Sequence, residues 1–145
     1  MAQWVKATGN SIPEGAVRGG YEKDGNSLFI VRAKMADGYM TPGKIGHHLP
    51  GAHFPYGGEE VILKEYEILV HQSCSEGYYD WKQGKDGKVP AGAVATDDCG
   101  MYVGRYSWDG GLHPGKVYTE HKVCYISYGG KELYNSSYEV LCKVR

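Results

Sequence analysis

Short apolar runs of strand length, separated by turn signals, follow one another along the whole chain. Residues 28–31 (Leu-Phe-Ile-Val) form a continuous apolar run of the kind that a buried strand shows, and residues 101–105 are similar. Residues 60–70, 122–128 and 138–144 are further strand-like runs. Asp-Gly, Pro-Gly and Gly-Gly pairs lie between the runs, and no ten-residue segment shows helical periodicity free of Gly and Pro. The pattern predicts a nearly all-β fold.

The same motifs occur twice in the same order. Each half of the chain opens with a Trp, and a Pro-x-Gly-Ala-Val segment follows nine residues later. An apolar run that ends in Arg comes next, and then Pro-Gly-Lys, Tyr-Gly-Gly-x-Glu and Tyr-Glu-Ile/Val-Leu. The matched positions are 4 and 81, 13–17 and 90–94, 42–44 and 114–116, 56–60 and 128–132, and 66–69 and 138–141. The motifs predict two tandem homologous repeats, residues 1–75 and 76–145.

The two repeats are expected to share one compact core. Each is too small to bury a core well by itself, so we expect short antiparallel strands of both repeats to pack about a pseudo-twofold axis. The largest difference in length follows the Gly-Ala-Val segment, where the second repeat is shorter by four residues (17–32 against 94–105). Because insertions and binding residues collect in surface loops, this loop is where the repeats are expected to differ in function.

Composition excludes several classes of protein. The chain has 145 residues, of which 22 are Gly and 13 are Tyr, and its net charge is −1. Its basic residues are scattered and form no Lys/Arg run. A nucleic-acid partner needs a basic face, so none is expected. No apolar stretch reaches the length of a signal peptide or a membrane span, which predicts no membrane insertion and a cytoplasmic location. Unconventional secretion or display at the cell surface is the alternative.

Cysteine and histidine positions favour neither a metal nor another cofactor. The four cysteines form no Cys-x-x-Cys pair and are expected to be free, buried thiols (Cys74, Cys99, Cys124 and Cys142). The histidines of the first repeat lack the spacing of known metal sites (His47, His48 and His53). No calcium loop, nucleophile elbow, phosphate loop or His-Glu-x-x-His motif occurs, so the chain is not expected to be an enzyme.

Six motifs, found twice in the same order, resemble the DM-nine repeat family, and two copies cover essentially the whole chain. In its tandem form this family is similar to the mannose-specific lectins of bivalve molluscs, which act in innate immunity. The resemblance implies a calcium-independent lectin for mannose or mannan, with mannose-containing glycans and microbial surface polysaccharides as partners in pattern recognition. A homodimer is expected, because doubling weak sites raises avidity.

The resemblance also implies the sugar-binding residues. In such lectins an acidic residue in the loop after the Gly-Ala-Val strand contacts the sugar, and so does the lysine of Pro-Gly-Lys. By motif these are Glu22 and Lys44 in the first repeat. In the second repeat Lys116 matches the lysine, and the shortened loop leaves Asp97 or Asp98 as the acidic partner. Glu22 is a departure, because the family lectin has Asp at this position.

Such a pair suits vicinal hydroxyls, because a carboxylate accepts hydrogen bonds from two neighbouring hydroxyls while an ammonium donates to their lone pairs. Tyr21 and Tyr39 are candidates for an aromatic wall. The repeated Arg and Tyr-Glu motifs have a structural interpretation, as ion pairs between Arg32 and Glu67 and between Arg105 and Glu139.

Two other functions compete with the mannose-specific lectin. One is an intracellular interaction or stress-response module that keeps the fold without binding sugar, and the Glu22 departure and the missing signal peptide keep this alternative open. The other is a lectin whose specificity Glu22 has shifted. Retention of the lysine in both repeats favours a lectin.

Overall fold

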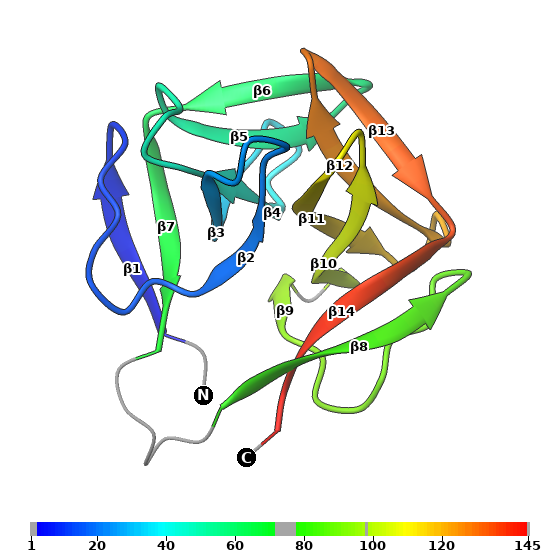
Figure 1. Ribbon diagram of the computed structural model, residues 1–145. Coiled ribbons are helices and arrows are strands. Elements are labelled where there is room, and N and C mark those ends of the chain that lie inside the picture. Colours follow the sequence, from blue (N-terminus) through cyan, green and yellow to red (C-terminus); the bar gives the residue numbers. More distant parts are fainter. Residues whose placement is uncertain (1–2, 72–77, 98, 145) are drawn as a thin grey trace.

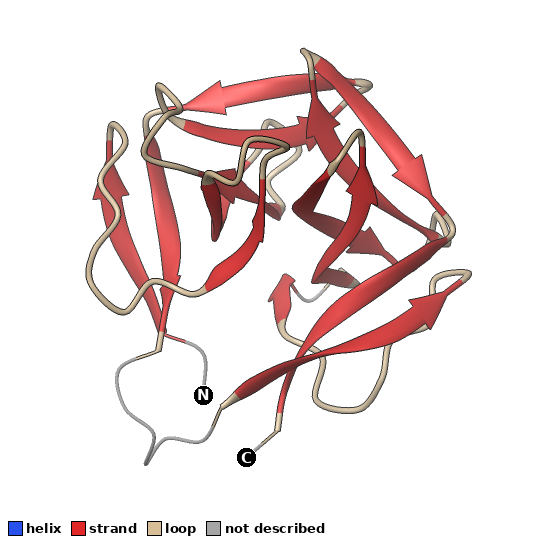
Figure 2. Cartoon of the chain, viewed as in Figure 1, coloured by secondary structure: helices blue, strands red, loops and turns tan. Residues whose placement is uncertain are grey.

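The computed structural model describes residues 3–71, 78–97 and 99–144, and these residues form strands, turns and loops with no helix among them (Figure 2). The prediction of an all-β fold is confirmed. The strands of the described chain are β1 (Gln3–Thr8), β2 (Arg18–Tyr21), β3 (Ser27–Lys34), β4 (Met40–Ile45), β5 (Ala52–Tyr56), β6 (Glu59–Leu63), β7 (Glu65–Val70), β8 (Tyr79–Lys85), β9 (Ala95–Asp97), β10 (Met101–Trp108), β11 (Gly111–Tyr118), β12 (Val123–Tyr128), β13 (Lys131–Asn135) and β14 (Ser137–Lys143).

The order of strands in the sheet is symmetric. It runs β1-β7-β3-β4-β5-β6 and continues β13-β12-β11-β10-β14-β8, so each strand of the first half has its counterpart at the mirrored place. Figure 1 shows the two halves side by side, meeting where β6 and β13 pair. Two homologous repeats therefore pack about a pseudo-twofold axis that passes between β6 and β13, as the motifs predict.

The Tyr-Gly-Gly-x-Glu motifs hold the repeats together at this axis. The backbone N–H of Glu60 donates to the Gly130 carbonyl, and that of Glu132 donates to the Gly58 carbonyl, both at 3.0 Å. The glutamate side chains reach back across the axis: Gly58 N–H donates to Glu132 Oε1 at 2.9 Å and Gly130 N–H donates to Glu60 Oε1 at 3.1 Å. Hydrogen bonds to a carboxylate are stronger than neutral ones. The glutamate of each motif therefore stabilises the contact with the other repeat.

Three groups of buried apolar side chains form the interior. One belongs to the first repeat, around Phe54, and one belongs to the second, around Ile126. The third is shared: Ile30 and Leu69 of the first repeat pack with residues of the second (Val94, Val103 and Leu141). Each such side chain contributes roughly 1.5–3 kcal/mol when fully buried. Part of the stability of each repeat therefore comes from the other repeat.

The glycine of Pro-Gly-Lys permits a close approach of two strands. A Cβ at Gly43 would overlap the backbone carbonyl of His53 on β5, and a Cβ at Gly115 would overlap that of Tyr125 on β12. Only glycine permits the paired strands to approach so closely at this point. The lysine that follows is thereby held on the side of the sheet that faces the other repeat.

The predicted ion pairs of the repeated Arg are confirmed, and each guanidinium also lies on a Trp ring. Arg32 Nε donates to Glu67 Oε1 at 2.7 Å and its guanidinium lies 4.5 Å from the ring centroid of Trp4. Cation–π contacts of this kind contribute about 0.5–1 kcal/mol at exposed sites. The second repeat has the same arrangement, with distances of 2.8 and 3.9 Å (Arg105, Glu139 and Trp81).

A second difference in length between the repeats lies in a hairpin turn. The β3–β4 hairpin turns over three residues, 36–38, whereas β10–β11 turns over the two residues Asp109 and Gly110. Both of these have positive φ, 47° and 79°, which matches the tight hairpin turns that follow the twist of a sheet. The tips of the two hairpins reach the opposite repeat, where they matter for the site described below.

Three of the four cysteines lie in the described part of the chain, and all three are free thiols. Cys124 and Cys142 are buried, whereas Cys99 is half-buried. Burial raises the pKa of Cys99 to about 11 and also raises the pKa values of the other two. These thiols are therefore protonated at neutral pH. Cys74 lies outside the described residues.

Candidate functional site

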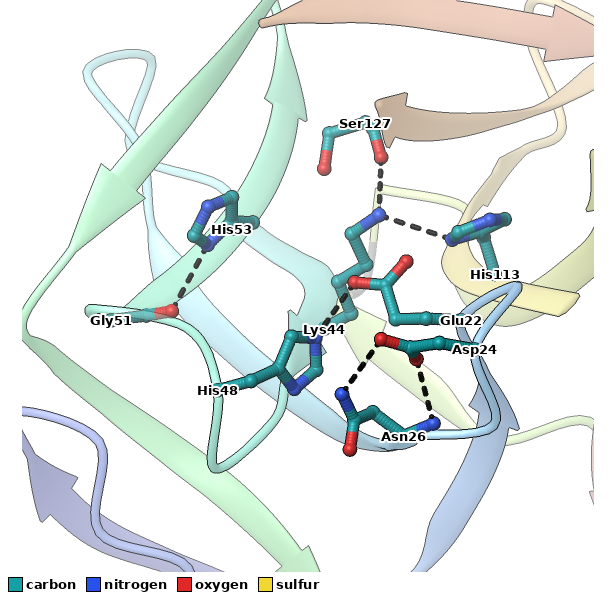
Figure 3. Close-up of polar contacts among 9 residues, drawn as sticks. All are labelled: Glu22, Asp24, Asn26, Lys44, His48, Gly51, His53, His113 and Ser127. Atoms are coloured by element: carbon teal, nitrogen blue, oxygen red, sulfur yellow. Dashed lines mark hydrogen bonds and ion pairs between the residues drawn. The ribbon is translucent and has the colours of Figure 1, made fainter. Parts of the chain in front are cut away.

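Lys44 is almost completely buried between the two repeats. It is 3% exposed, although it carries an ammonium group. Its Nζ donates to the Ser127 carbonyl at 2.5 Å and to Nδ1 of His113 at 3.1 Å (Figure 3). The Tyr128 ring centroid lies 5.6 Å from the same nitrogen. All three partners belong to β11 and β12 of the second repeat. The ammonium thus makes two hydrogen bonds to the second repeat.

Glu22 stands beside this ammonium, in the loop that follows β2. In Figure 3 its side chain lies among those of Lys44, His48 and His113. Nε2 of His48 is 2.8 Å from Glu22 Oε2, which fixes the carboxylate. Burial lowers the pKa of Lys44, while the negative charges of Glu60 and Glu22 act in the opposite direction. The structure therefore brings together the predicted pair of Glu22 and Lys44.

His113 is the neutral partner of the buried lysine. Burial, reinforced by the positive charge of Lys44, lowers the pKa of His113 to about 4. The imidazole is therefore uncharged at pH 7, and its Nδ1 accepts from the ammonium. The Tyr128 ring meets it edge to face at 5.1 Å, and the Tyr128 hydroxyl donates to Asp109 Oδ2 at 2.6 Å. The ring of Tyr128 is thus fixed on two sides.

Lys116 occupies the equivalent place in the second repeat. It is 6% exposed, and its Nζ lies 3.4 Å from Glu132 Oε2. The ring centroids of Tyr56 and Tyr125 lie 5.7 and 5.2 Å from the same nitrogen. These residues line a pocket of about 210 Å³, which Asp37 also lines. The second lysine therefore faces a pocket lined by both aromatic and charged side chains.

Each site is assembled from both repeats. The Lys44 site takes Tyr128 and the hairpin-tip residue Asp109 from the second repeat. The Lys116 site takes the corresponding residues Tyr56 and Asp37 from the first. One repeat alone would therefore supply only part of either site.

The acidic partner predicted for Lys116 is Asp97 or Asp98, and the carboxylate of Asp97 binds backbone N–H groups. Asp97 Oδ2 accepts from the backbone N–H of Met40 at 2.7 Å, and Oδ1 accepts from that of Cys99 at 3.2 Å. Its carboxylate thus holds β9 against β4, and its role as a sugar ligand stays a prediction. Asp98 lies outside the described residues.

The aromatic residues of the two sites come mainly from positions that the sequence did not single out. Tyr39 does line the Lys116 pocket. Tyr21 is exposed on β2 and lies against Arg18, 5.7 Å from the guanidinium. The site tyrosines at 56 and 128 belong to the duplicated Tyr-Gly-Gly-x-Glu motif, together with the glutamates at 60 and 132. Duplication of the motif marks these residues as important. It does not indicate that the tyrosine of one repeat contacts the lysine of the other.

Two further features bear on the chemistry. Within 3–71, 78–97 and 99–144, no three His, Cys, Asp or Glu side chains gather in a way that could hold a metal ion. No helix in that part of the chain has the length and apolar character needed to cross a membrane.

Comparison with known families agrees with the duplicated motifs. The pattern of the DM9 repeat matches residues 1–62, 35–96 and 95–145, which together span the chain. This chain belongs to the DM9 repeat family. The matched segments overlap, so they support the repetitive character of the DM9 chain without setting a boundary between its repeats.

The DM9 chain also has curated relatives and a structural neighbour. It is similar to Natterin-1 and Natterin-3 of Thalassophryne nattereri, with 30% identity over 141 residues and 31% over 140. These alignments cover 95% and 96% of this chain but 37% and 36% of the relatives, so the chain spans about a third of their length. The nematode sperm cell motility protein MFP2B matches with a TM-score of 0.74 and 17% identity, over 100% of this chain and 47% of that one. This last likeness is one of fold.

Proposed function

We propose that this DM9 chain is a non-enzymatic lectin that binds mannose-containing glycans at two sites, one at Lys44 and one at Lys116. The observation that carries the proposal is the repeated arrangement of a nearly buried ammonium, a carboxylate and a tyrosine ring. Burying a charged lysine costs free energy, because the ammonium loses its contact with water, so a buried lysine usually has a role. Here both repeats keep one at the same place.

The arrangement suits a hexose. An ammonium N–H donates to the lone pairs of a sugar hydroxyl, and a carboxylate oxygen accepts from the neighbouring hydroxyl. Both bonds are charge-assisted, and the low exposure of the site strengthens them. Glu22 and Lys44 provide this pair in the first site, and Tyr128 offers an apolar ring for the C–H face of the sugar. No step requires calcium, so binding is proposed to be calcium-independent.

Two sites on one chain support recognition of repetitive surfaces. A single shallow sugar site binds weakly, whereas two linked sites bind a polymer through effective concentration. We therefore extend the proposal to microbial surface polysaccharides as targets, in pattern recognition of innate immunity, and to a homodimer that would double the number of sites.

Retention on a mannose resin in the presence of EDTA tests the proposal. We expect the wild-type protein to be retained and to be released by free mannose, with other monosaccharides compared as competitors. Lys44→Met and Lys116→Met remove the ammonium and keep the volume of the stem, so each is expected to weaken retention. Lys64→Met is the matched control, because Lys64 is exposed and outside both sites.

Wild-type protein that passes through the resin with EDTA or with calcium would overturn the lectin function. Retention by the double variant Lys44→Met/Lys116→Met at the wild-type level would overturn the assignment of the two sites.

A further inference from the structure

The second site continues outward along a row of side chains on one face of the sheet. Lys116 on β11 lies directly opposite Tyr125 on β12, and Tyr125 lies directly opposite Tyr134 on β13. Residues directly opposite in an antiparallel pair point to the same face. The rings of Tyr125 and Tyr134 are 6.3 Å apart between centroids, and Tyr134 is 71% exposed. The row therefore leads from a buried ammonium to open solvent.

Further rings surround the inner end of this row. Tyr118 and His121 have centroids 4.5 Å apart, and His121 lies 5.8 Å from Tyr125. Nδ1 of His121 is also 2.8 Å from the Tyr125 hydroxyl, which fixes both rings. Tyr118, His121 and Tyr125 line the pocket of about 210 Å³ together with Lys116. Aromatic contact is thus continuous from the pocket to its exposed end at Tyr134.

The first repeat keeps the lysine but not the rings. By the same strand register its row is Lys44, His53 and Ile62. His53 is buried, and its Nδ1 lies 3.0 Å from the Gly51 carbonyl (Figure 3). Gly46 stands at the place of Tyr118. Because Ile62 is itself 48% exposed, the fold does not require an aromatic residue at this position of the sheet.

We propose that the second site is an extended glycan site: Lys116 holds one sugar residue in the pocket, while Tyr125 and Tyr134 pack against residues that follow along the oligosaccharide. The first site takes a single terminal residue. This inference rests on the proposed function and adds that the two repeats differ in the length of glycan they bind. Its physical basis is that an exposed aromatic ring gains most by covering an apolar face, and the C–H faces of successive hexoses provide one.

Titration with mannose and with mannotriose separates the two sites. Lys44→Met isolates the second site and Lys116→Met isolates the first. In Lys44→Met we expect mannotriose to bind at least about fivefold more tightly than mannose, as one added aromatic contact implies. In Lys116→Met we expect only the statistical gain that repeated sugar residues give.

Tyr134→Ile tests the outer end of the row, because it introduces the residue that the first repeat carries at the equivalent place. In the Lys44→Met background it is expected to reduce the preference for mannotriose by about fivefold. Tyr78→Ile is the matched control, since Tyr78 is also an exposed tyrosine, 52% exposed, but lies before β8 and outside the pocket. Thermal unfolding of each variant verifies that it is folded.

Equal affinities of Lys44→Met for mannose and mannotriose would overturn the extended site and leave the proposed function standing. A preference for mannotriose that survives Tyr134→Ile would do the same. Wild-type protein that binds neither sugar would overturn both.

Discussion

Acid should destabilise this protein through His113, and replacing His113 should remove that effect. The residue is fully buried beside the Lys44 ammonium, and the equivalent place in the first repeat is occupied by Thr41. His113→Thr therefore tests the site with a side chain that the fold accepts at the symmetric position. In the variant the titrating imidazole is absent, while the other ionisable groups are unchanged.

The magnitude follows from the pKa. Burial, with the added effect of Lys44, lowers the pKa of His113 to about 4, against 6.5 in the unfolded chain. Between these values the unfolded state binds a proton and the folded state does not, so the free energy of unfolding decreases as the pH falls from 6.5 towards 4. At 1.36 kcal/mol per pKa unit the full loss is about 3 kcal/mol, of which about 2 kcal/mol is reached by pH 4.5.

Urea unfolding at pH 7.0, 5.5 and 4.5, followed by tryptophan fluorescence, measures this loss. Wild type and His113→Thr differ only at residue 113, so the difference between their pH slopes isolates the histidine. We expect wild type to lose about 2 kcal/mol more than His113→Thr between pH 7.0 and 4.5. Parallel losses in the two proteins would refute a buried, neutral His113.

Three further substitutions test the framework around the sites. Gly115→Ala should cost several kcal/mol or prevent folding, seen as lost yield or a lowered Tm, because its Cβ overlaps the backbone of β12. Glu132→Ala should lower the free energy of unfolding in urea by about 3 kcal/mol, because it removes one of the two side-chain bonds across the pseudo-twofold axis and the carboxylate that pairs with the buried Lys116 ammonium. An effect below the error of the method would contradict this role of Glu132. Arg105→Lys should cost about 1–2 kcal/mol, since it loses the planar contact with the Trp81 ring, and unchanged stability would contradict that contact.

The features of the fold that can be predicted from the sequence are those that the duplicated motifs indicate. Two copies of one set of motifs, each too small for a core of its own, imply an all-β pair about a pseudo-twofold axis. The ion pair of Arg32 with Glu67 also follows, because both residues recur with their partners in the second repeat. These features depend on the order of the motifs and on their recurrence, and both can be read directly from the sequence.

Only part of the site can be predicted from the sequence, because several of its contacts join the two repeats. Glu22 and Lys44 are named by the resemblance to the DM9 family, and they lie together in the structure. Tyr128 could not be assigned to Lys44, because that contact crosses from one repeat to the other and depends on how the strands pair at the axis. Asp109 could not be assigned to the Lys44 site either, because it reaches that site only through its bond to the Tyr128 hydroxyl. Contacts between repeats leave no local spacing signal.

Calorimetric titration with mannose in EDTA tests the central claim most directly, namely one sugar site at Lys44 and one at Lys116. The account predicts two sites per chain in the wild-type protein, one in Lys44→Met, one in Lys116→Met and none in the double variant, with Lys64→Met like wild type. Absence of saturable heat in the wild-type protein, or an unchanged number of sites in the double variant, would contradict it.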